Sequence, residues 1–264
     1  MKEMVCFDID GTLRDTKDHI VLDSTMKALR KLKENGYKIV ISTGRGKDSL
    51  EGTGMMEIID WDGFVCNNGQ VVMNSNREII YHALMDPKAV EEVLRVAEET
   101  GRVVCLKAKQ RKLNKEPNEY TFTSLKFFNN PLPPVGTYEG EDVDAMIVYG
   151  PMHDDYKDFL DIEGISVYPG ESTYADVCIK GVTKASGIKV LLDLYGLKEY
   201  IAFGDSMNDY YMIREAKISV CMGQGNEDLK KMSTYVTDAI DQDGLYNACI
   251  HLGLFEEDKH EIHD

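Results

Sequence analysis

The chain lacks any long apolar run. The longest runs have four or five residues, as at residues 4–7 and 145–149, whereas a membrane-spanning helix needs roughly 20. The first run already stops at Asp8, so we expect no signal peptide. These absences argue against a helical membrane protein, and we expect the protein in the cytoplasm.

Cations and paired cysteines are scarce as well. The sequence has 30 Lys and Arg against 46 Asp and Glu, a formal charge of −16, which disfavours binding to nucleic acid or to anionic membranes. No two of the six cysteines are close in sequence, so neither a disulfide framework nor a cysteine zinc site is expected. The oligomeric state stays open between a monomer and a homodimer.

Strand-like and helix-like segments alternate at both ends of the chain. Residues 4–7 and 37–41 are apolar runs typical of buried strands, and residues 24–35 between them have helical spacing. We expect Asp23 or Ser24 to cap that helix, and a further helix over residues 50–61. The pattern predicts an α/β fold with a Rossmann-like parallel sheet.

The middle of the chain has a different character. A helix is predicted from Pro87 to about residue 100, because proline favours the first turn of a helix. The pattern indicates an inserted α+β module over residues 85–181, between two halves of a core at residues 1–84 and 182–264. Within it we expect strands at 103–107, 120–127, 145–149, 166–168 and 174–179 and a helix at 156–160.

The first chemical signal is the sequence DIDGT at residues 8–12, directly after a strand. Asp8 and Asp10 are two residues apart and share a face, at the strand end where open α/β sheets bind ligands. Two carboxylates so close repel each other unless a cation lies between them, and Mg²⁺ prefers oxygen ligands. An ordinary Asp-Gly turn is the alternative interpretation.

Three further loops add polar groups at strand ends. Ser42, Thr43, Gly44 and Arg45 follow the next strand, where a hydroxyl and backbone amides can bind a phosphate oxygen, or merely cap a helix. Lys184 opens a predicted helix, against the usual preference for acids there. The fourth loop follows another apolar strand and contributes Asp205, Asn208 and Asp209. Together they predict a magnesium site beside a phosphate site, with one carboxylate free to attack phosphorus.

These four loops resemble the motifs of the haloacid dehalogenase superfamily, and within it the Cof-type phosphatases with a C2 cap (subfamily IIB). The resemblance covers almost the whole chain, including later stretches at residues 220–223, 235–237 and 243–245. Only 34 residues separate Asp8 from Thr43, whereas 140 lie between Thr43 and Lys184. The inserted module must therefore lie in the second interval, which in this family implies a C2 cap that selects the substrate.

The resemblance also implies roles for single residues. Asp8 is the nucleophile that becomes an aspartyl-phosphate, and Asp10 is the general acid and base. The Asp8 carboxylate, the Asp10 backbone carbonyl and Asp205 hold Mg²⁺. The implied phosphate-binding residues are Thr43, Gly44, Lys184 and Asn208, and the implied supporting residues are Asp209, Arg45 and Ser42.

The expected activity is hydrolysis of a small phosphorylated metabolite, such as a sugar phosphate, flavin mononucleotide or pyridoxal phosphate. A phosphomutase or phosphotransferase is an alternative, and so is a non-enzymatic phosphoacceptor domain. Five cations in the cap, at residues 107–115, could be a solvated loop or could overhang the cleft and attract an anionic substrate. Asn67, Asn68 and Glu171 are further specificity candidates.

Overall fold

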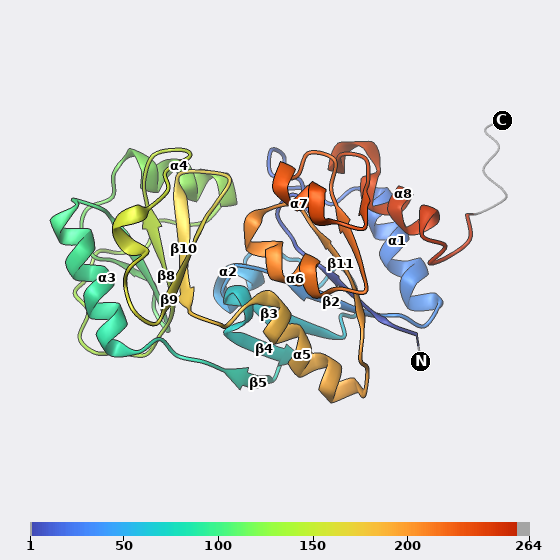
Figure 1. Cartoon of the computed structure of the whole chain (residues 1–264), viewed down its shortest axis with the longest axis horizontal. Helices are drawn as coiled ribbons and strands as arrows, with labels where there is room; N and C mark the ends of the chain where they lie inside the picture. The colour runs from blue at the N-terminus through green and yellow to red at the C-terminus, as the bar shows by residue number, and fades with distance from the viewer. Residues whose placement is uncertain (1, 258–264) are drawn as a thin grey trace.

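The computed structural model describes residues 2–257, which form two β-sheets with helices around them (Figure 1). The larger sheet has the strand order β13-β12-β11-β1-β2-β3-β4-β5, parallel from β13 to β3 and antiparallel from β3 to β5. Its strands are β1 (Met4–Phe7), β2 (Lys38–Ser42), β3 (Gly63–Cys66), β4 (Val71–Asn74), β5 (Ile79–His82), β11 (Tyr200–Gly204), β12 (Ile218–Cys221) and β13 (Tyr235–Val236). The predicted α/β class with a parallel sheet is confirmed.

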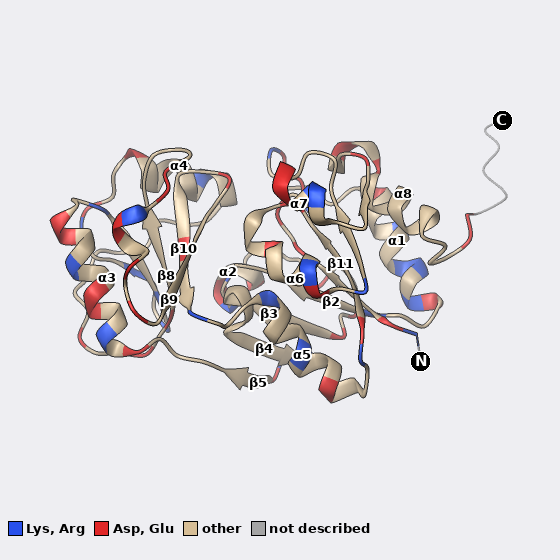
Figure 2. Ribbon diagram, in the orientation of Figure 1, with Lys and Arg blue, Asp and Glu red and all other residues tan. Residues whose placement is uncertain are grey.

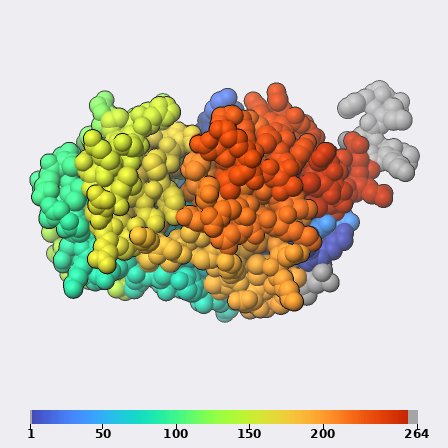
Figure 3. Space-filling view, in the orientation of Figure 1, coloured from blue at the N-terminus to red at the C-terminus, as the bar shows by residue number. Residues whose placement is uncertain are grey.

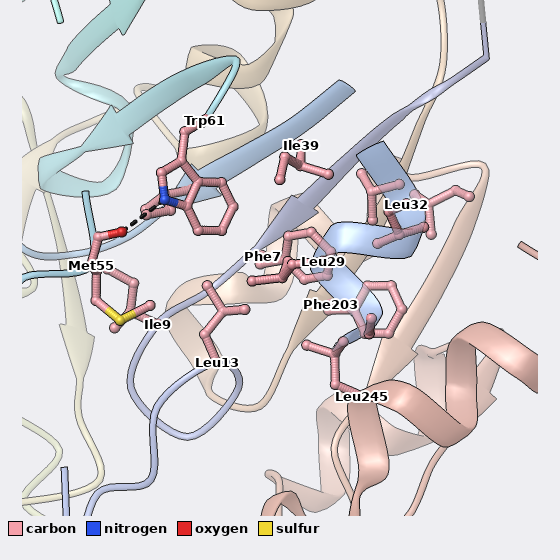
Figure 4. Packing of buried hydrophobic residues seen from close by; sticks show 14 of the residues in the cluster. Phe7, Ile9, Leu13, Leu29, Leu32, Ile39, Met55, Trp61, Phe203 and Leu245 are labelled. Carbon is pink, nitrogen blue, oxygen red and sulfur yellow. Dashed lines mark hydrogen bonds between the residues drawn. The ribbon is translucent and has the colours of Figure 1, made fainter. Parts of the chain in front are cut away.

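Helices cover both faces of this sheet, which explains why its central strands are apolar throughout. In β1, Phe7 faces a core that it shares with Leu29 of α1 (Asp23–Glu34) and Leu245 of α8 (Gly244–His251) (Figure 4). Its neighbour Cys6 faces the opposite core, together with Ile188 of α5 (Lys184–Tyr195). The helices α6 (Tyr210–Glu215) and α7 (Glu227–Met232) also pack on that second face.

The smaller sheet is antiparallel, with the order β7-β6-β8-β10-β9. Its elements, with two helices, are α3 (Pro87–Glu99), β6 (Val104–Ala108), β7 (Lys112–Leu113), α4 (Glu119–Phe128), β8 (Val143–Tyr149), β9 (Ile165–Pro169) and β10 (Tyr174–Ile179). The helix α3 covers one face through Val90 and Val93. The other face packs partly against Phe128 at the end of α4, and strand alternation places Lys107, Ile147 and Asp176 there.

The chain crosses between the two sheets twice, after β5 and after β10. One buried residue of the larger-sheet part is hydrogen-bonded to the chain at both crossings. The backbone carbonyl of the buried Gln70 accepts a hydrogen bond from the Ala83 amide at 2.8 Å, and its side-chain Oε1 accepts one from the Ile179 amide at 2.9 Å. In the space-filling view the middle of the chain, coloured green to yellow, lies directly against the part built from its two ends (Figure 3).

The prediction of a strand at residues 120–127 was wrong, because these residues form the helix α4. The Tyr, Thr and Phe residues there favour strands, but Asn118 starts a helix by accepting a hydrogen bond from the Thr121 amide at 3.1 Å. The predicted helix at 50–61 was also wrong in extent. Only α2 (Lys47–Glu51) forms, ended by Gly52 and by Gly54 in a left-handed conformation.

Two smaller predictions need correction. The residue before α1 is Leu22, with no side-chain cap, because Asp23 and Ser24 already lie at or inside the helix start. The helix expected at residues 156–160 is a single 3₁₀ turn, Lys157–Phe159. Over residues 2–257, no helix reaches the length and apolar character needed to cross a membrane.

A glycine lets α5 approach the sheet closely. A Cβ on Gly187 would lie 2.5 Å from Cγ1 of Val65, so we expect Gly187→Ala to lower the free energy of unfolding by about 1–3 kcal/mol through overpacking. Helix propensity alone predicts the opposite sign, a gain of about 1 kcal/mol. Urea denaturation measures the difference.

Gly52→Ala is the matched control, because the nearest atom to its added Cβ is 3.5 Å away and its φ of −64° suits alanine. We expect that variant to unfold close to the wild-type midpoint. A Gly187→Ala variant as stable as this control would contradict the close packing of α5.

Candidate active site

The loop after β1 folds tightly and presents two carboxyl groups. The Asp8 amide donates to the Phe203 carbonyl at 3.0 Å, which continues the sheet, and the amides of Leu13 and Arg14 then fold back onto the Ile9 carbonyl. Gly11 has a φ of +91°, and a Cβ there would lie 2.3 Å from Oδ2 of Asp205. Glycine is therefore required both for the turn and for the approach of the fourth loop.

The loop after β2 separates its two hydroxyl groups. Thr43 lines the cavity described below, and its Oγ1 accepts a hydrogen bond from the Arg45 amide at 3.0 Å. Ser42 lies at the end of β2 with its hydroxyl buried and without a hydrogen-bond partner. The geometry thus brings Thr43 and Gly44 to the candidate site, but not the side chain of Ser42.

Lys184 is the first residue of α5 and is fully buried between two carboxylates. Its Nζ lies 2.7 Å from Oδ1 of Asp8 and 2.6 Å from Oδ1 of Asp209. Burial works to lower the pKa of this lysine, but the charges of Asp209 and Asp8 outweigh it, so its pKa is raised and the ammonium group stays charged. A fixed cation therefore lies directly beside the nucleophile candidate.

Asp209 orients this cluster. Its second oxygen, Oδ2, accepts hydrogen bonds from the amides of Asp205 at 3.0 Å and Ser206 at 3.2 Å. Both oxygens of Asp209 are thus occupied by donors, whereas Asp205 receives one bond, from the Thr12 hydroxyl at 3.1 Å. The loop after β11 therefore positions Asp205 toward Asp8 and leaves it able to bind a cation.

Asp8, Asp205 and Asp209 each place one carboxylate oxygen within 4.8 Å of the other two. Burial raises the pKa of Asp8 to about 7, and burial together with the charge of Asp8 raises the pKa of Asp205 well above its ordinary value. Such a cluster is short of positive charge even with Lys184 present. An all-oxygen donor set with this deficit fits a hard divalent cation such as Mg²⁺.

Asp10 has a different partner. Arg45 binds both carboxylate oxygens of Asp10, with Nε 2.6 Å from Oδ2 and Nη2 2.8 Å from Oδ1. Its side chain is therefore held outside the Asp8, Asp205 and Asp209 cluster, although it lines the same cavity. Each oxygen keeps a second lone pair, and Asp10 lines the cavity, so this carboxylate can accept a proton from a ligand there.

A cavity of about 360 Å³ joins these residues to the smaller sheet. From the core, its lining includes Asp8, Asp10, Thr43, Gly44, Asp205 and Asn208. The opposite wall includes Phe127, Phe128, Tyr174, Ile147, Lys107 and Asp176. Catalytic candidates from the larger sheet therefore face an apolar and aromatic wall that contains one buried ion pair, Lys107 to Asp176 at 3.2 Å.

Four of the five cations at residues 107–115 fall into two groups, and the fifth, Lys109, is exposed. Lys107 and Arg111 line the cavity, and Arg111 pairs with Asp48 of α2 at 2.5 Å. Lys112 and Lys115 instead pair with Glu141 and Glu98. Acidic and basic residues likewise alternate along the outer helix α3 (Figure 2). The stretch is therefore not one basic patch, and only its first part reaches the cleft.

The sequence analysis missed some residues that line the cavity, and two of its specificity candidates do not line it. Glu171 lines the cavity as expected, whereas Asn67 and Asn68 do not, although Asn68 donates to Asp176 at 3.1 Å. Asp176 was missed, yet an acid inside an apolar strand is a detectable signal. Phe128 and Asn130 were missed because the residue pattern favours a strand where the helix that presents them forms.

Comparison with known proteins adds an independent finding. The family model of the haloacid dehalogenase-like hydrolases matches residues 5–249. YkrA of Bacillus subtilis (strain 168) is 26% identical over 259 residues, covering 96% of this chain and 99% of that protein. The 5-amino-6-(5-phospho-D-ribitylamino)uracil phosphatase YcsE of the same strain is 24% identical, covering 94% and 95%.

Solved structures resemble this chain along almost its whole length. The HAD subclass IIB sugar phosphatase BT4131 is 29% identical, with a TM-score of 0.87, covering 96% of this chain and 100% of that one. BT1666 from Bacteroides thetaiotaomicron, described among phosphatases of the haloalkanoate (HAD) enzyme superfamily, is 27% identical with a TM-score of 0.86, covering 97% and 96%.

The crowded carboxylates predict a stability effect of Mg²⁺. Mg²⁺ at a hundredfold excess over its Kd adds about 2.7 kcal/mol to the free energy of unfolding. At roughly 2–4 °C per kcal/mol, this raises Tm by several degrees. Thermal unfolding with MgCl₂, against NaCl of equal ionic strength, measures this shift.

Asp205→Asn is the control, since it removes one of the mutually repelling charges. We expect this variant to be at least as stable as the wild type without metal and to gain little from Mg²⁺. An equal Mg²⁺ shift in both proteins would place the metal elsewhere.

Proposed function

The chain belongs to the haloacid dehalogenase-like hydrolases and is a phosphatase of that family, and we propose that it hydrolyses small phosphorylated metabolites through an aspartyl-phosphate on Asp8. One observation carries this proposal. The buried Lys184 lies 2.7 Å from Asp8, and Asp8 lines a cavity together with Asp10 and Thr43. The residues that we assign as nucleophile, proton carrier and phosphate ligands therefore lie around one space.

The proposed first step forms a covalent intermediate. A carboxylate oxygen of Asp8 bonds to phosphorus, and the bond from phosphorus to the substrate oxygen breaks. Asp10 gives its proton to that oxygen, so the product leaves as an alcohol. In the second step a water oxygen attacks phosphorus and passes a proton to the Asp10 carboxylate. The bond to Asp8 then breaks, and inorganic phosphate is released.

The fixed groups around phosphorus stabilise the charge that it carries during transfer. We assign Lys184, the Thr43 hydroxyl, the Gly44 amide and Asn208 to the phosphoryl oxygens. Burial raises the pKa of Asp8 and Lys184 lowers it, and with both effects present the pKa is raised to about 7.

Mg²⁺ is the cofactor that the donor set fits. We propose that the Asp8 carboxylate, the Asp10 backbone carbonyl and Asp205 hold it, while Asp209 orients Asp205 and Lys184. When bound, the ion neutralises charge on the transferring phosphoryl group and orients it.

We propose that residues 85–181 act as a cap that selects the substrate, on a core made of residues 1–84 and 182–264. The aromatic wall and the 360 Å³ volume suit a sugar phosphate or a phosphorylated cofactor such as pyridoxal phosphate or flavin mononucleotide. YcsE is named as a phosphatase of a phosphorylated ribitylaminouracil, and BT4131 is named as a sugar phosphatase. All six cysteines are free thiols, which suits the reducing cytoplasm that we propose as its location.

The test measures phosphate release from a panel of phosphorylated sugars and cofactors, with Mg²⁺ and with EDTA. We expect release that needs the metal and falls by about a thousandfold or more in Asp8→Asn, because the nucleophile is lost. A phosphomutase would instead form an isomeric phosphate ester and little inorganic phosphate. Asp8→Asn that retains wild-type turnover would contradict the assignment of the nucleophile.

A further inference from the structure

Arg45 lies between Asp10, the general acid candidate, and the cap. Its guanidinium group is hydrogen-bonded through every N–H group. Nε and Nη2 bind the two oxygens of Asp10. Nη1 donates to the Ser49 hydroxyl at 2.9 Å and to Oδ1 of Asn130 at 3.2 Å, and Nη2 donates to the Phe128 carbonyl at 3.0 Å. Each of the five N–H groups of this side chain thus has a partner.

The bond to Asp10 fixes direction as well as distance. A planar guanidinium that binds both carboxylate oxygens holds the carboxylate in its own plane, which a lysine cannot do. Arg14, the other cation beside Asp10, comes no nearer than 3.8 Å and donates to the His19 carbonyl. The orientation of Asp10 therefore follows the position of Arg45.

The position of Arg45 depends in turn on the end of α4. Asn129 is left-handed with a φ of 53°, and the Asn130 amide bonds back to the Leu125 carbonyl at 2.9 Å, which closes the helix end. The last carbonyl, of Phe128, then faces Arg45, where the negative end of the helix favours a cation. The Phe128 ring also lies 5.1 Å from the guanidinium carbon.

We propose that Arg45 is the positioning residue for Asp10, and that Phe128 and Asn130 of the cap set the position of Arg45. The inference rests on the proposed function, in which Asp10 carries the proton in both steps. The cap thereby controls proton transfer on the core as well as the choice of substrate.

This role differs from a general joining of the two sheets. Arg111 and Asp48 also connect cap and core, at 2.5 Å, but neither is hydrogen-bonded to Asp10. Disturbing that pair should therefore loosen the junction without moving the proton carrier. Asp48→Asn is for this reason the matched control.

The two chemical steps distinguish a specific effect on Asp10 from a general effect on the whole site. With p-nitrophenyl phosphate the leaving group departs without a proton, so a misplaced Asp10 slows mainly the hydrolysis of the aspartyl-phosphate. Rapid-mixing measurement of p-nitrophenolate then shows a burst of about one per active site, followed by a slow phase. With a hexose 6-phosphate both steps need Asp10, and no burst of alcohol is expected.

We expect Arg45→Lys to raise the ratio of burst rate to steady-state rate by about a hundredfold, the lower range of what general acid and base catalysis supplies. Asn130→Ala, which keeps the arginine, should raise it by roughly fivefold, as for one lost hydrogen bond. The double variant should be no worse than Arg45→Lys alone, since both changes act on one chain of contacts. Asp10→Asn provides the reference pattern, and Asp48→Asn should leave the ratio unchanged.

The outcomes are distinct. If Arg45→Lys and Asn130→Ala slow the burst and the later phase by the same factor, the two residues act on the whole site and the inference is wrong. It is equally wrong if Asp48→Asn reproduces the Asn130→Ala pattern. If wild type releases no p-nitrophenolate with Mg²⁺ present, the proposed function fails, and this inference fails with it.

Discussion

The structure depends above all on one buried group of charges. Asp8 and Asp209 pair with Lys184, and Asp205 lies beside those two carboxylates. Each ion taken out of water costs several kcal/mol unless it is paired and hydrogen-bonded. The strand order meets part of that demand, since β11, β1 and β2 are parallel neighbours and end at the same edge of the sheet. The start of α5 brings the lysine, and Gly187 lets that helix come close enough.

The sequence was most informative where chemistry and strand ends coincide. A charged or polar residue directly after an apolar strand has few explanations, so the strand pattern alone predicts that Asp8, Thr43 and Asp205 meet at one edge. Local propensity failed where tertiary packing and capping decide instead. Residues 120–127 contain strand-favouring side chains, yet Asn118 starts a helix whose end carries the contacts to Arg45.

Pairing of charges could not be predicted from the sequence, because partners lie far apart in the chain. The cations at residues 107–115 form no common patch: Lys107 binds Asp176, and Arg111 binds Asp48 across the two sheets. Asp10 illustrates the same limit. The motif placed it beside Asp8, but its bidentate partner and the link from there to the cap depend on tertiary geometry.

The binding of both chain crossings by Gln70 has a consequence for how such proteins change over time. A module that leaves and returns beside one core residue can be lengthened, shortened or replaced while the strands on either side keep their register. If residues 85–181 select the substrate, as we propose, a change confined to them would alter specificity and leave the carboxylates of the larger sheet in place. On our proposal for Arg45, a replacement of that part would have to keep the contacts from Phe128 and Asn130 to this arginine.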